Sequence, residues 1–160
     1  MRKGRVIKLP DLYVLIGEQN TRKSSTIRAL SGFRDRSGGG LARPHYITFS
    51  NGQQEAFYIE PTSLQEKKIP SINVINEANN YDNVLLALRE KSINNYPDYY
   101  EYLDDFITAG WRIVGLLVLG TNTLQRGLPS TISNVLYEPN SKNKSSNALA
   151  AQLRNSWQWL

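Results

Sequence analysis

Three short apolar runs, separated by helical patterns and turns, constrain the fold of this chain most. They are residues 12–17 (Leu-Tyr-Val-Leu-Ile-Gly), 84–88 and 112–119. A short, nearly continuous apolar run is typical of a strand buried on both faces, as in a parallel sheet. Because amphipathic helical patterns lie between the runs, we expect an α/β fold, with a mainly parallel sheet and helices on both faces.

Weaker signals complete this expected architecture. Two apolar segments, 46–49 and 56–59, flank Asn51-Gly52 and predict a β-hairpin. Residues 134–137 predict a further strand, and residues 71–83 are ambiguous. Helices are expected over 23–30, 62–67 and 97–109. Residues 31–44 predict a surface loop that could serve as a lid. At 160 residues, the chain is expected to form a single domain over 1–160.

A last helix is expected near the C-terminus. Ser145-Ser146 can cap it, and its inner stripe is predicted to be Leu149, Leu153, Trp157 and Leu160. Trp159 is expected to be exposed, where it could mark a partner surface.

Composition excludes several classes of site. The chain has no cysteine, which rules out disulfides and thiolate metal sites. Its single histidine, His45, makes a histidine-based zinc site or a catalytic triad within one chain a poor fit. The longest apolar run, 113–119, is far below the roughly 20 residues needed to cross a bilayer. We therefore expect a cytoplasmic protein with no membrane partner.

Positive charge is concentrated at the start of the chain. Residues 1–43 hold ten Lys and Arg against three acids, a net charge of +7, whereas residues 44–160 carry a net charge of −2. A basic region attracts phosphate in nucleotides, polynucleotides or anionic lipids. Ordinary solvated surface charge is the equally weighted alternative.

One segment carries a specific chemical pattern. Directly after the first apolar run the chain reads Gly-Glu-Gln-Asn-Thr-Arg-Lys-Ser-Ser over residues 17–25. This segment resembles the phosphate-binding loop of the P-loop NTPase superfamily, G-x-x-x-x-G-K-[ST]. Gly17, Lys23 and Ser24 fall in register, and Arg22 replaces the second glycine. The strand before the motif and the helix after it give the context that such a loop requires.

The resemblance implies nucleotide chemistry and a role for each residue. ATP or GTP with Mg²⁺ would be the ligand, and the reaction would be hydrolysis. Lys23 would reach the β- and γ-phosphates, Ser24 would coordinate Mg²⁺, and Arg22 would act as a built-in arginine finger. Cofactor contacts are implied for Gly17, Asn20, Thr21, Arg22, Lys23, Ser24 and Ser25.

A carboxylate for Mg²⁺ is less clearly indicated. No apolar strand ends in aspartate, but Glu60 and Glu90 each follow one, and they are equal candidates for metal ligation. Thr121 and Asn122 follow the strand 112–119, in a place that suits either a γ-phosphate sensor or a turn. The acids Glu101 and Asp105 share a predicted helical face, where a solvated surface is the expected role.

Two other functions remain open at this level. The first is a non-catalytic module that binds nucleic acid or a protein partner through a relict loop, as the absent aspartate allows. The second is a subunit whose active site a protein partner completes. An N-K-x-D motif is absent, so base reading of the GTPase type has no support.

Overall fold

The computed structural model describes residues 8–33 and 45–160, and in this part of the chain six strands form one sheet. The strands are β1 (Asp11–Ile16), β2 (His45–Thr48), β3 (Gln54–Glu60), β4 (Asn83–Leu88), β5 (Arg112–Leu119) and β6 (Val135–Glu138). Their order is β2-β3-β4-β1-β5-β6, and only β2 is antiparallel to its neighbour. The predicted hairpin, the three apolar strands and the strand near residues 134–137 are therefore confirmed.

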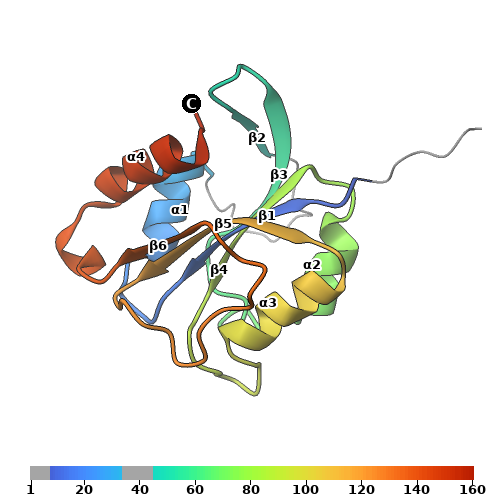
Figure 1. Cartoon of the computed structure of the whole chain (residues 1–160), viewed down its shortest axis with the longest axis vertical. Coiled ribbons are helices and arrows are strands. Elements are labelled where there is room, and N and C mark those ends of the chain that lie inside the picture. Colours follow the sequence, from blue (N-terminus) through green and yellow to red (C-terminus); the bar gives the residue numbers. More distant parts are fainter. Residues whose placement is uncertain (1–7, 34–44) are drawn as a thin grey trace, which may run out of the picture.

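Helices cover both faces of this sheet (Figure 1). They are α1 (Lys23–Ser31), α2 (Ser71–Ala78), α3 (Tyr99–Thr108) and α4 (Ser146–Trp157), with the short 3₁₀ helix η1 (Ser141–Asn143) before α4. Side chains alternate along β1, so Leu12 and Val14 pack toward α2 and α3, while Tyr13 and Leu15 pack toward α1 and α4. The expected α/β architecture with a mainly parallel sheet is confirmed.

Helix ends follow the local sequence closely. Ser145 caps α4, because its hydroxyl accepts a hydrogen bond from the Ala148 amide at 3.0 Å. Asp98 caps α3 in the same way, so Pro97 lies just before the cap rather than in the first helical turn. The ambiguous stretch 71–83 becomes α2, a turn and the first residue of β4.

The helix predicted for Thr62–Lys67 is wrong, since these residues form turns instead. Tertiary hydrogen bonds compete with helix formation there. The Leu64 amide donates to the Ala87 carbonyl of β4, and the buried Gln65 side chain bonds both backbone groups of Arg89. Lys68 then ends the segment with a positive φ of 57°.

The two expectations for the C-terminus are also wrong. Trp159 is buried at 4% exposure, and Leu160 is 76% exposed. Gln158 adopts a left-handed conformation that ends α4, so the helical stripe stops at Trp157. Trp159 forms an antiparallel bridge with Phe49, and its ring packs against Phe57 and Tyr13.

Two further expectations concern the loop and the membrane. Most of the predicted loop and lid, residues 34–44, lies outside the described residues. Within 8–33 and 45–160, no helix has both the length and the apolar content that a bilayer crossing requires.

Candidate functional site

The segment 17–25, which follows β1, lies where the sheet architecture favours ligand binding. Gly17 follows β1, its amide bonds the Leu88 carbonyl of neighbouring β4 at 3.0 Å, and α1 begins at Lys23. In open α/β sheets, ligands bind beyond the carboxyl ends of the strands. The strand, loop and helix order expected from the sequence is therefore present at the expected edge.

Two glycines make room for Thr21 beneath the loop. A Cβ on Gly17 would lie 2.5 Å from the Thr21 hydroxyl oxygen, and a Cβ on Gly120 would lie 2.7 Å from the Thr21 methyl group. Thr21 is buried and donates to the Glu18 carbonyl at 2.7 Å. This hydrogen bond closes the loop on itself. Gly17 is needed both for the turn after β1 and because a Cβ at this position would collide with the Thr21 hydroxyl group.

Arg22 occupies the backbone conformation in which glycine is usual. It has φ 77° and ψ 21°, in the left-handed region, and it directly precedes α1. Its exposed side chain reaches across the site, where Nη2 donates to the Lys142 carbonyl at 3.1 Å. The loop thus keeps a glycine-like shape despite the arginine, and the arginine ties it to the segment before α4.

Replacing Arg22 by glycine is expected to stabilise the fold. The Arg22→Gly variant removes the cost of a left-handed non-glycine residue, which is about 1 kcal/mol, and gives up one solvent-exposed hydrogen bond. Its free energy of unfolding in urea should rise by up to about 1 kcal/mol. An Arg22→Ala variant is the control, since it loses the hydrogen bond and keeps the strain; equal destabilisation by both would contradict the prediction.

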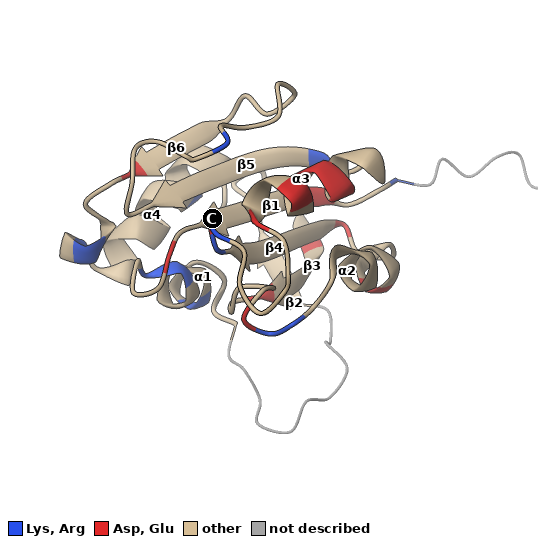
Figure 2. Cartoon of the chain, turned by 90° about the horizontal axis from the view of Figure 1, so that it is seen from below, with Lys and Arg blue, Asp and Glu red and all other residues tan. Residues whose placement is uncertain are grey.

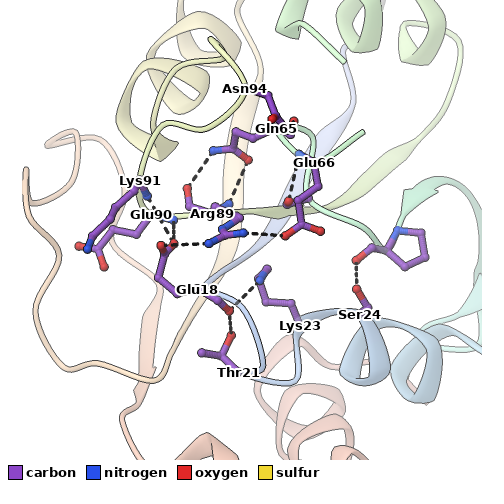
Figure 3. A network of polar contacts seen from close by, with 12 residues as sticks. Glu18, Thr21, Lys23, Ser24, Gln65, Glu66, Arg89, Glu90, Lys91 and Asn94 are labelled. Atoms are coloured by element: carbon purple, nitrogen blue, oxygen red, sulfur yellow. Dashed lines mark hydrogen bonds and ion pairs between the residues drawn. The ribbon is translucent and has the colours of Figure 1, made fainter. Parts of the chain in front are cut away.

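Lys23 is buried inside the loop. It is 7% exposed, and its Nζ donates to the Glu18 carbonyl at 3.0 Å (Figure 3). Burial lowers the pKa of Lys23, and the nearby Glu66 carboxylate partly opposes this shift. Within the described residues, the one hydrogen bond of this ammonium group is to a neutral carbonyl.

The serines of the motif lie at the start of α1. The Ser24 hydroxyl donates to the Pro61 carbonyl at 2.8 Å, and the Ser25 hydroxyl contacts the Arg22 carbonyl and Ser146. A serine hydroxyl has one proton and two lone pairs, so the Ser24 oxygen can still coordinate a cation while it donates this proton. Asn20, with φ 65°, shapes the preceding turn.

A cavity of about 550 Å³ opens over this loop. Residues 19–25 line most of it, and Arg28, Glu66 and Lys142 complete the wall. No side chain caps α1 at Arg22, and the first amides of a helix lack intrahelical acceptors. These amides and the helix dipole favour an anion at this place.

The two acids singled out from the sequence lie outside this lining. The Glu90 carboxylate is buried and accepts from the Gln125 amide at 2.7 Å. Glu60 ends β3 and lies 3.5 Å from the Lys67 ammonium group. Their assignment as metal ligands stays a prediction, but neither reaches the cavity directly.

Glu66 is the acid that lines the cavity, and the sequence analysis did not identify it. Its side chain is 35% exposed and lies 3.3 Å from Arg89 Nη1. Arg89 also lies 3.5 Å from the Glu18 carboxylate, which itself accepts from the Glu90 amide (Figure 3). Because Gln65 fixes the backbone beside Glu66, this carboxylate is preorganised. The signal in the sequence was only Gln-Glu within an apparently helical stretch.

The other candidates from the sequence have local roles. Thr121 and Thr123 bond each other in a turn, which is the alternative to a phosphate sensor. The helical acids form ordinary polar contacts, for example Asp105 with Ser71, and within the described residues no three His, Cys, Asp or Glu side chains form a metal-holding group. Six of the ten cations of residues 1–43 lie outside the described residues, and nucleic-acid binding through this basic region stays an alternative hypothesis.

Comparisons with protein-family models, curated proteins and solved structures returned no match for this chain. The resemblance to P-loop NTPases therefore rests on the motif and its surroundings, and function is inferred from the residues of this chain alone.

Proposed function

We propose that this protein binds the polyphosphate group of ATP or GTP together with Mg²⁺ and hydrolyses its terminal phosphoanhydride bond. The observation that supports this most is the Lys23 ammonium group, which is buried inside the loop and bonded only to the Glu18 carbonyl within the described residues. A buried cation without a carboxylate contact is costly unless an anion joins it.

The loop amides, the start of α1 and the Ser24 hydroxyl group suit the same ligand. Loop amides and the start of α1 offer donors to phosphate oxygens, and the Ser24 oxygen has lone pairs for Mg²⁺. Mg²⁺ takes most of its other ligands from water and substrate phosphate, so it would need few protein ligands besides Ser24. When bound, Mg²⁺ would neutralise charge on the phosphates.

Glu66 is the best-placed group to act on the attacking water. In the proposed step, the water oxygen bonds to the terminal phosphorus while the P–O bond that bridges the β- and γ-phosphates breaks. The products are the nucleoside diphosphate and inorganic phosphate. Glu66 would orient this water and accept its proton, and Lys23 would stabilise the charge on the phosphate oxygens.

Nucleotide binding should raise the melting temperature of the full chain. With Mg·ATP or Mg·GTP at 100 times its dissociation constant, the gain in unfolding free energy is about 2.7 kcal/mol, or about 5–10 °C at this chain length. Differential scanning fluorimetry with and without Mg²⁺ measures this shift. AMP is the matched control, since it keeps the nucleoside and lacks the β- and γ-phosphates; no shift with either triphosphate would overturn the proposal.

A further inference from the structure

Every described side chain that lines the cavity carries a polar group, which bears on what part of a ligand it recognises. Each of the ten lining side chains within residues 8–33 and 45–160 carries a charge, an amide or a hydroxyl group, and four are cationic: Arg22, Lys23, Arg28 and Lys142. Among these described residues, Glu66 is the one acid. In the described part of the chain, the cavity wall therefore offers no aromatic or aliphatic side chain to a nucleobase.

Nucleobases are usually held on apolar and aromatic surfaces. Small-molecule sites are lined predominantly by apolar and aromatic side chains, and stacking a base on an aromatic ring is worth about 1–3 kcal/mol. This wall offers charge and hydrogen bonds instead. Its cationic and hydrogen-bond donors match phosphate oxygens much better than they match a flat nucleobase.

The cations are also spread along the cavity rather than gathered at one point. Lys23 lies inside the loop, whereas Arg22 and Lys142 are exposed. Arg28 lies one helical turn beyond Ser24, about 6 Å farther along α1 at 1.5 Å per residue. Figure 2 shows Lys and Arg along α1 and near the start of α4. Positive charge thus continues away from the loop, so the cavity wall offers several separate cations to a ligand with more than one phosphate.

Lys142 is held in place by contacts from distant parts of the sequence. Arg22 Nη2 donates to the Lys142 carbonyl at 3.1 Å. Four residues later, the Ser146 hydroxyl donates to the Ser25 hydroxyl at 2.7 Å. These contacts fix the segment 142–146 against α1. The backbone of Lys142 is therefore anchored at the cavity wall, and its exposed side chain starts from this fixed position.

We infer that the site recognises a linear chain of phosphates and draws little affinity from the nucleoside attached to it. The ligand class is a linear oligophosphate, whether it comes as a nucleoside triphosphate or as inorganic tripolyphosphate. This inference rests on the proposed function, because it assigns the same loop, and it narrows the substrate to its phosphate portion.

Calorimetric titration of the full chain with Mg²⁺ tests the inference. The ligands are sodium tripolyphosphate, ATP, GTP, CTP and UTP, each added separately. Dissociation constants within about threefold of one another are expected, since a stacked base would tighten binding by about 5- to 150-fold. A nucleotide that binds more than tenfold tighter than tripolyphosphate overturns the inference while the proposed function stands. If none of the five ligands binds, both fail.

A pair of matched variants adds a second readout. Lys142→Gln should weaken tripolyphosphate and ATP binding by the same factor, about two- to fivefold for one exposed cation. Lys8→Gln removes the same charge before β1, at the opposite end of that strand, and should leave both affinities unchanged. A loss of ATP affinity alone in Lys142→Gln would show that Lys142 contacts the nucleoside, which would contradict the inference.

Discussion

Replacing Lys23 by methionine is expected to weaken Mg·ATP binding by about 10- to 100-fold. A hydrogen bond to a charged partner contributes about 1.5–3 kcal/mol, and each 1.4 kcal/mol is tenfold in affinity. The Lys23 ammonium group is already desolvated and lies within the loop, so little solvation is lost when phosphate arrives. Calorimetric titration of Lys23→Met and wild-type protein measures the ratio.

This substitution should leave the fold intact. Methionine keeps the apolar stem, and the Glu18 carbonyl retains its hydrogen bond from Thr21 at 2.7 Å. Loss of the buried charge also removes a desolvation cost, so the free energy of unfolding should not fall by more than about 1 kcal/mol. Lys8→Met is the control, since it removes an exposed lysine far from the loop. Unchanged nucleotide affinity in a folded Lys23→Met protein would remove the phosphate-loop assignment.

Replacing Glu66 by glutamine is expected to slow nucleotide hydrolysis by about 100-fold or more while nucleotide binding persists. A positioned general base contributes about 10²–10⁴ to the rate, and an amide does not accept the proton from water. Glutamine has nearly the same shape, and the partly exposed ion pair with Arg89 adds little to stability. Release of inorganic phosphate under saturating Mg·ATP gives the rate.

Three other glutamates sharpen this experiment. Glu101→Gln changes an exposed carboxylate on α3 and should leave the rate unchanged. Glu60→Gln and Glu90→Gln test the two acids that the sequence favoured. If either slows hydrolysis and Glu66→Gln does not, the general base has been assigned to the wrong residue. Absence of turnover in the wild-type protein would instead leave a phosphate-binding module.

Much of the fold could be predicted from the sequence because its strands are buried on both faces. The runs at 12–17, 84–88 and 112–119 lack polar alternation, and this pattern excludes most architectures other than a parallel sheet covered by helices. Predictions failed where long-range contacts outweighed local pattern. Gln65 bonds the end of β4 rather than continuing a helix, and Trp159 folds back onto the hairpin.

The motif residues of the site could be predicted for the same local reason. A glycine after a strand, followed by Lys-Ser at a helix start, brings Lys23 and Ser24 to the loop through chain connectivity alone. The conformation of Arg22 could not be predicted, since few non-glycine residues adopt a left-handed backbone and its stabilising contact is 120 residues away.

The sequence by itself thus determined the mainly parallel sheet, the helices α1, α3 and α4, and the loop between β1 and α1. These features depend on periodicity and on residues within about ten positions of one another. Only the tertiary structure decided which acid and which distant cation share the cavity. Glu66 and Lys142 reach it because strand order and side-chain hydrogen bonds set the positions of their segments. Contacts of this kind join segments far apart in the chain, and no local pattern encodes them.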